Sequence, residues 1–346
     1  MKPVGLVVIG RNEGQRLRLC LLAALGKVAQ VVYVDSGSTD GSVELARSLK
    51  VDVVELDLST NFTAARARNA GFAHLLQADA QIEFIQFVDG DCEVVEGWLD
   101  FAQRELDAQS NVAVVCGRRR ERFPELSIYN QLCDIEWDTP VGEAKACGGD
   151  AMMRVEAFQQ VGGFNSTLIA GEEPELCVRL RQKGWKILRL DAEMTVHDAQ
   201  ITRFSQWWKR SLRGGYAYAE GAWLHGNSPE RHWVKESLSI WFWGLLLPLL
   251  ACGMAWQANG LSLWLLVGYP LQTYRIYRLM QQRGFRSKHA ALYALFGILG
   301  RCPNLLGHLK FFLNKLLGQS NKLIEYKESS PIPRDFTDRN PLKPVP

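Results

Sequence analysis

Four short apolar runs alternate with helix-like stretches near the start of the chain, and no other feature of the sequence constrains the fold as much. The runs span residues 4–9, 30–34, 51–56 and 82–88. They lack the polar alternation of half-exposed strands, which indicates strands covered by helices on both sheet faces. This rhythm predicts an α/β fold with a mostly parallel sheet and flanking helices.

Polar and glycine residues follow three of these runs directly. The loops begin at Gly10, at Asp35 and at Asp89. In open α/β sheets, ligands bind beyond the carboxyl ends of the strands. We therefore expect the three loops to face one crevice.

The third of these loops carries the sharpest local motif, Asp89-Gly90-Asp91. In an extended segment, residues i and i+2 point the same way, so the two carboxylates are expected to converge. Gly90 would let a ligand approach the backbone. Paired carboxylates suit Mg²⁺ or Mn²⁺ carried by a diphosphate, although the same motif alone also occurs as a solvated turn.

Two acidic residues, Glu172 and Glu173, open a predicted helix that stops at Gly184. Pro174 is expected at its first helical position. Carboxylates at a helix N-terminus offset the macrodipole, and one held beside the crevice can also take a proton from an acceptor hydroxyl. Further along, His197 is interpreted either as a metal ligand from the far side of the site or as a core histidine.

No charged residue occurs between positions 237 and 274. Two apolar arms are separated there by residues 257–260. About 20 helical residues span a bilayer core of ~30 Å, and the second arm reaches that length only if it continues to Met280 with its arginines at the interface. A membrane hairpin is predicted, with a re-entrant hairpin or two buried core helices as alternatives.

Basic residues flank this hairpin on both sides. Arg231, His232 and Lys235 precede it, and from Arg275 onward roughly 13 basic residues stand against 4 acidic ones. The positive-inside rule therefore places both flanks in the cytoplasm. Since the N-terminal apolar run is too short for a signal peptide, the protein is expected at the cytoplasmic face of the inner or plasma membrane.

The predicted organisation has four parts. Residues 1–230 form the α/β domain, 231–280 the hairpin of two hydrophobic helices, 281–328 amphipathic or interfacial helices, and 329–346 a loose tail. Lysines interleaved with leucine and phenylalanine at 304–317 are typical of an interfacial helix. The tail is rich in proline and charge.

Composition excludes some classes of partner. The formal net charge of the 346 residues is only +3 and no basic stripe is present, which argues against a nucleic-acid partner. The eight cysteines form no CxxC pair and no zinc-spaced cluster, so a reducing compartment is expected.

Five segments occur in a recognisable order: VVIGRNEGQRL, VDSGSTDGS, ARARNAGF, FVDGD and AGEEPELCVRLRQKGW. Over roughly its first 220 residues the chain resembles the family-2 glycosyltransferases with a GT-A fold, of the bacterial exopolysaccharide or cell-envelope type. The resemblance implies a nucleotide-diphospho-sugar donor, a divalent metal (Mn²⁺ or Mg²⁺), and inverting transfer to an acceptor hydroxyl.

The resemblance also implies roles for single residues. Contacts to the nucleotide sugar fall on Arg11, Asn12, Glu13, Asp35, Arg68, Asp89 and Gly90. The metal falls on Asp91, with Asp89 and His197 as further ligands. Alignment puts Glu173 at the position of the catalytic base. Many family members have Glu-Asp where this chain has two glutamates, so Glu172 remains a competitor.

The predicted function is transfer of a sugar, from a UDP-sugar, to a lipid-linked or membrane-proximal saccharide in polysaccharide or glycolipid biosynthesis. One alternative is a polyprenyl-phosphate hexosyltransferase, and a more remote one is a non-catalytic membrane scaffold. Residues 10–14 match neither the basic phosphate loop of nucleotidyltransferases nor the GxGxxG motif of dehydrogenases.

Overall fold

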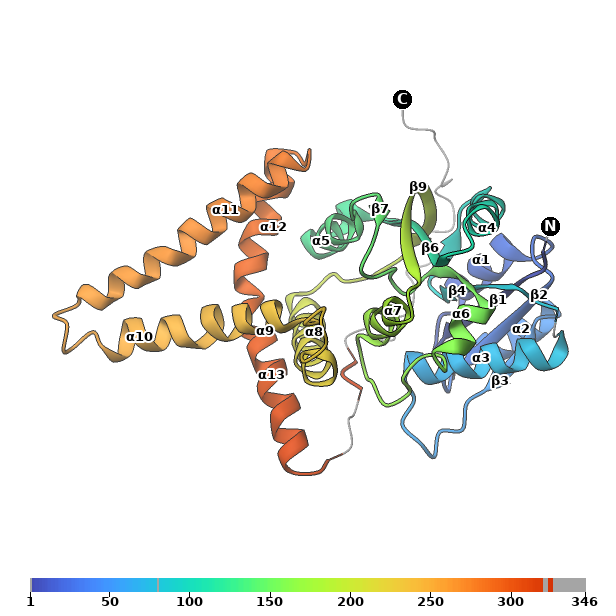
Figure 1. Cartoon of the computed structure of the whole chain (residues 1–346), viewed down its shortest axis with the longest axis horizontal. Helices are drawn as coiled ribbons and strands as arrows, with labels where there is room; N and C mark the ends of the chain where they lie inside the picture. The colour runs from blue at the N-terminus through green and yellow to red at the C-terminus, as the bar shows by residue number, and fades with distance from the viewer. Residues whose placement is uncertain (1, 80, 320–322, 326–346) are drawn as a thin grey trace.

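The computed structural model describes residues 2–79, 81–319 and 323–325. An α/β domain at the N-terminal side leads into an all-helical C-terminal region (Figure 1). The loose tail expected at 329–346 lies outside the described residues.

One half of the sheet is parallel, as the sequence rhythm predicts. Its strands, in spatial order, are β3 (Asp52–Glu55), β2 (Gln30–Asp35), β1 (Val4–Gly10) and β4 (Phe84–Asp89). The helices α1 (Gln15–Ala24), α2 (Ser42–Ser48) and α3 (Ala64–Ala78) alternate with these strands along the chain. The predicted runs therefore match the observed strands to within about two residues at each end.

The other half of the sheet is mixed. It contains β5 (Cys92–Val94), β6 (Val112–Glu121), β7 (Gly142–Glu143), β8 (Ala151–Arg154) and β9 (Lys186–His197). β8 lies antiparallel between β4 and β6, and β6 and β9 are parallel. β5 and β7 pair antiparallel with β9.

The remaining helices of the α/β domain are α4 (Trp98–Ala108), α5 (Ile128–Trp137), α6 (Val155–Gln160) and α7 (Glu172–Gln182), with a short 3₁₀ turn, η1 (Pro124–Leu126). α3 packs very close to the sheet, since a Cβ at Gly71 would lie 2.5 Å from Cγ1 of Val7. α7 begins at Glu172, so Pro174 is its third residue and not its first. A proline fits there because backbone N–H groups in the first turn have no partner within the helix.

The C-terminal region consists of α8 (Phe204–His225), α9 (Val234–Trp241), the π turn η2 (Phe242–Leu246), α10 (Leu247–Gly253), the 3₁₀ segment η3 (Leu261–Val267), α11 (Gly268–Gln282), α12 (Ser287–Leu299) and α13 (Arg301–Leu316). In Figure 1, α9–α10 and α11 form two arms that meet far from the α/β domain. The continuous α12–α13 closes the open side between them.

Two helical segments are long and apolar enough to cross a membrane. They are Val234–Gly253 and Ser287–Leu316. In the most apolar window of each segment, 17% and 33% of the residues, respectively, are buried. The first is the expected first arm of the hairpin. The second joins what the sequence suggested were separate short helices.

α13 is held tightly against α8. A Cβ on Gly307 would overlap backbone atoms of Leu212 and Tyr216, and one on Gly215 would overlap the backbone of Asn304. The two glycines therefore let the helix backbones meet directly, which packs α13 tightly against α8.

Candidate active site

The carboxyl ends of β1, β2 and β4 lie at the same edge of the sheet. The register pairs Gly10 with Asp35 and Ile9 with Asp89. A cavity of about 180 Å³ opens there. Its lining includes Gly10, Arg11, Glu13, Ser36, Asp89, Gly90, Asp91 and, from α8, Arg213. The three predicted loops thus do face one crevice.

In the loop after β1, both Arg11 and Asn12 contact residues of other segments. The Arg11 guanidinium pairs with Glu325 at 2.9 Å and lies over the Phe62 ring at 4.8 Å from its centroid. Asn12 has a positive φ of 56°, and its side-chain oxygen accepts a hydrogen bond from the Thr39 N–H at 2.7 Å. Asparagine tolerates this backbone conformation better than most residues.

Asp35 shapes the second loop. Its carboxylate accepts hydrogen bonds from the backbone N–H groups of Gly37 at 2.8 Å and Ser38 at 2.7 Å. The Tyr33 hydroxyl donates to it as well, at 2.7 Å. Asp35 is 2% exposed, and it is its neighbour Ser36 that lines the crevice.

An ionic network lies beneath the crevice. The Asp89 carboxylate pairs with Arg68 at 2.7 Å and with Arg119 at 3.0 Å, and Arg68 also pairs with Glu172 at 2.7 Å. Burial opposes ionisation of Asp89, but the two guanidiniums outweigh it and hold the pKa of that carboxyl below its usual range. The network joins the end of β4 to α3, β6 and the start of α7.

Asp89 and Asp91 both line the crevice but contact different partners. The chain turns at Gly90, where the N–H donates to the Ile9 carbonyl at 2.8 Å, so the alternation of an extended strand does not apply. A Cβ at Gly90 would lie 3.1 Å from that same carbonyl oxygen, which shows how closely the backbones approach. Asp91 therefore faces a different set of partners from Asp89.

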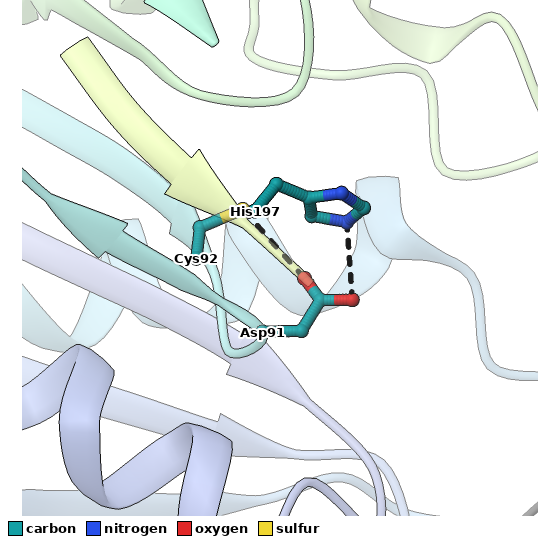
Figure 2. A group of neighbouring side chains, drawn as sticks. All are labelled: Asp91, Cys92 and His197. Atoms are coloured by element: carbon teal, nitrogen blue, oxygen red, sulfur yellow. Dashed lines mark hydrogen bonds and ion pairs between the residues drawn. The ribbon is translucent and has the colours of Figure 1, made fainter. Parts of the chain in front are cut away.

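The partners of Asp91 include Cys92 and His197 (Figure 2). His197 Nε2 lies 3.2 Å from Asp91 Oδ2, and the Cys92 thiol donates to Asp91 Oδ1 at 3.6 Å. His197 arrives from the end of β9 because the antiparallel register pairs it with Cys92.

This group fits a divalent metal. Asp91 and His197 are 5% and 6% exposed; His197 Nδ1 has no hydrogen-bond partner among the described residues but lies 3.6 Å from the Glu121 carboxylate. Carboxylate oxygens suit Mg²⁺ and Mn²⁺, and imidazole is a common metal ligand, so the pair is compatible with a divalent ion. Burial raises the pKa of the Cys92 thiol, which makes it a weak third ligand.

The two glutamates that open α7 have different surroundings. Glu172 belongs to the ionic network through Arg68. Glu173 accepts hydrogen bonds from the Cys147 N–H and from the Cys177 thiol, the latter at 3.3 Å. Glu173 thereby holds the loop before β8, in which a Cβ on Gly149 would lie 2.9 Å from Asp89 Oδ2.

Two central residues, Arg119 and Asp150, are assigned no site role by the sequence analysis. Asp150 is fully buried and accepts hydrogen bonds from the Asp89 N–H at 3.0 Å and from the Thr195 hydroxyl at 2.7 Å, while it also pairs with Arg119. A run of three arginines at 118–120 at the end of an apolar strand was the available signal. Alternation along that strand turns the middle arginine to the opposite face from its neighbours.

Two family profiles match the sequence. The family described as Glycosyl transferase family 2 matches residues 6–162, which include all three loops of the crevice. A second, described as the N-terminal domain of galactosyltransferase, matches residues 134–203, which include Glu172, Glu173 and His197.

Curated relatives carry glycosyltransferase or polysaccharide names. The succinoglycan biosynthesis protein ExoA of Rhizobium meliloti is 28% identical over 192 residues, which cover 52% of this chain and 57% of that protein. The O-antigen chain rhamnosyltransferase RfbN of Salmonella typhimurium is 24% identical over 211 residues, which cover 56% of this chain and 65% of the relative. The chain thus matches little more than half the length of ExoA.

The fold has a similar solved structure. It is the mannosyltransferase PcManGT from Pyrobaculum calidifontis in complex with GDP-Man and Mn²⁺, with a TM-score of 0.58 and 16% sequence identity. The alignment covers 91% of this chain and 88% of that one, so the similarity in fold extends beyond the sheet. Residues 6–162 thus match a family-2 glycosyltransferase domain, and the fold is a GT-A domain followed by an all-helical C-terminal region.

Proposed function

We propose that the protein transfers a sugar with inversion from a UDP-sugar to a hydroxyl of a lipid-linked or membrane-proximal saccharide, at the cytoplasmic face of the membrane. The observation that carries this proposal is the crevice at the sheet edge, which is lined by Asp91, a residue whose carboxylate contacts His197. The names of ExoA and RfbN favour a role in synthesis of an extracellular or cell-envelope polysaccharide.

Asp91 and His197 would hold the divalent ion. When bound, such an ion supplies positive charge that stabilises the departing diphosphate. Arg68 and Arg119 keep Asp89 ionised and fixed beside this position. The protein would thus present a rigid, charged floor to the donor, which is the preorganisation that catalysis of group transfer requires.

Glu173 is the carboxylate that we propose as the base. Its neighbour Glu172 is engaged by the guanidinium of Arg68, whereas Glu173 is held by a peptide N–H and a thiol, both neutral. Glu173 also lies against the loop whose Gly149 touches Asp89. It would take the proton of the acceptor hydroxyl as that oxygen attacks the anomeric carbon from the side opposite the leaving group. Glu172 would position Arg68.

The direct test is donor binding to the purified full chain in detergent. Thermal stability is followed with UDP- and GDP-sugars, in the presence and absence of Mn²⁺. A UDP-sugar that stabilises only with Mn²⁺ is the expected result, because a ligand of the folded state alone adds RT ln(1 + [L]/Kd). Failure of every nucleotide to stabilise a folded protein would overturn the proposal in favour of a non-catalytic scaffold.

A further inference from the structure

A second, larger cavity lies between the GT-A domain and the C-terminal helices. Its volume is about 650 Å³, and its walls come from α5, α8, α12 and α13. It reaches Gly171, directly before the two glutamates of α7, and it shares Arg213 with the donor crevice. The two cavities are therefore neighbours on either side of one arginine.

Positive charge predominates in the lining of this second cavity. Three arginines, Arg210, Arg213 and Arg301, face two carboxylates, Glu136 and Glu236. Arg210 pairs with Glu136 at 2.7 Å, and the remaining lining residues Arg213, Arg301 and Glu236 together carry one net positive charge.

Arg301 also has a donor that no group in the protein satisfies. Its Nε is buried and has no hydrogen-bond partner among the described residues. Buried polar groups in folded proteins are normally hydrogen-bonded. An unpartnered guanidinium nitrogen in the wall of a cavity therefore points to an anionic ligand.

One wall of the cavity belongs to an apolar helix. Tyr293, Phe296 and Gly297 of α12 line it, and α12 lies within the candidate membrane segment Ser287–Leu316. On the same helix, Leu295 and Leu299 are 58% and 41% exposed. A ligand with a charged head in the cavity could thus lay an apolar chain along the outside of α12.

We propose that this cavity binds the phosphate or diphosphate of a membrane lipid that carries the acceptor saccharide. The guanidinium fork matches phosphate oxygens, and the link through Arg213 directs the saccharide toward the donor crevice. The inference rests on the proposed function and names its acceptor class.

The test measures binding of geranylgeranyl diphosphate to the detergent-solubilised full chain. We expect Arg301→Gln to weaken binding at least tenfold and Arg301→Lys, which keeps the charge, to weaken it less. The matched control is Lys310→Gln, which removes an exposed charge from the same helix and should bind like the wild type. UDP-sugar stabilisation with Mn²⁺ is recorded for each variant, and its persistence shows that the fold is intact.

Three results would overturn the proposal. The first is equal binding of the lipid by wild type and Arg301→Gln. The second is equal binding of uncharged geranylgeraniol. The third is displacement of the lipid by inorganic pyrophosphate at equal concentration, which would indicate a site for a free anion. Binding that depends on Arg301 in a protein that no nucleotide sugar stabilises would support the cavity and contradict the proposed transfer. The two failures are therefore distinguishable.

Discussion

Asp91 reaches His197 because the short strand that follows Asp91 is paired with the last strand of the sheet. The pairing of Cys92 with His197 joins residues about 100 positions apart at one point of the crevice. Their carboxylate and imidazole are buried and in contact, so, as the proposed metal ligands, both side chains would be positioned before a metal binds. A carboxylate and a histidine held in this way should make donor binding depend on the metal.

Asp91→Asn is therefore expected to lose the metal-dependent part of donor binding. In the wild type, a UDP-sugar at 100 times its Kd should add about 2.7 kcal/mol to the free energy of unfolding when Mn²⁺ is present. In the variant, thermal unfolding should be the same with Mn²⁺ as with EDTA. Asp57→Asn, at an exposed position, is the control. An unchanged Mn²⁺ response in Asp91→Asn would contradict the assignment of the metal ligands.

Glu173→Gln and Glu172→Gln separate the base from its neighbour. Glu173→Gln should bind the UDP-sugar like the wild type and lose transfer by about 10²–10⁴-fold, as expected when a general base is removed. Glu172→Gln should instead weaken donor binding, because it releases Arg68 from the network under the crevice. The measurements are sugar transfer and thermal stabilisation on the same samples. Near-normal transfer by Glu173→Gln would exclude it as the base.

The sequence located the residues that sit in local motifs but missed those whose partners come from distant strands. Asp91 and the two glutamates of α7 each lie at the end of a strand or the start of a helix. Arg119 and Asp150 meet Asp89 only because β8 lies between β4 and β6 in the sheet. That strand order depends on packing of the whole domain, and no local pattern encodes it. Likewise, the turn at Gly90 overrode the alternation expected of an extended strand.

At the scale of elements, the contact between α8 and α13 depends on glycine. Gly215 and Gly307 bring the helix backbones together where a side chain would separate them. By contrast, a Cβ at Gly297, on the preceding helix α12, would have Cδ1 of Ile276 as its nearest neighbour, at 3.9 Å. The two glycines Gly297 and Gly307 therefore provide a matched pair.

Gly307→Ala is expected to destabilise the protein by about 1–3 kcal/mol, the usual cost of overpacking. Gly297→Ala should be neutral or stabilising, since alanine is favoured over glycine in a helix by about 1 kcal/mol. Thermal unfolding measures the difference. Equal midpoints for the two variants would show that α8 and α13 are not in tight contact.

The elements themselves were predictable to different degrees. The four parallel strands follow from buried apolar runs. Because these runs alternate with helices along the chain, the strands are expected to pair in parallel. The short strands β5, β7 and β8 have no such run, and their pairing is decided by neighbours distant in sequence. The join between α12 and α13 passes through Gly300 in a helical conformation, where a glycine and a following Cys-Pro would favour a break.

At the scale of the whole molecule, the two arms α9–α10 and α11 project away from the GT-A domain (Figure 1). Large apolar side chains are exposed there, with Leu249 of α10 59% exposed and Trp264 of η3, between the arms, 71% exposed. Exposed apolar surface of this extent marks an interaction site, and the first arm, within Val234–Gly253, is long and apolar enough to cross a bilayer. Membrane attachment through the arms would leave the donor crevice in the aqueous phase.

Leu249→Lys is therefore expected to weaken retention by membranes. A lysine near the centre of a membrane helix costs about 2.5–3.5 kcal/mol on the insertion scale. The control is Leu58→Lys in the GT-A domain, where the leucine is equally exposed at 60%. Co-sedimentation with vesicles and extraction by alkaline carbonate measure retention. If Leu249→Lys and Leu58→Lys are retained alike, the arms do not anchor the protein.

The distribution of cysteines also divides the molecule in two. Six thiols are buried, all within the GT-A domain, whereas Cys252 at the end of α10 and Cys302 at the start of α13 are exposed. A maleimide reagent will therefore modify the native, folded chain only in its helical C-terminal region. Fluorescent or spin labels can be attached there without any engineered substitution, and the distance between them reports how far the tip of the hairpin lies from the base of α13.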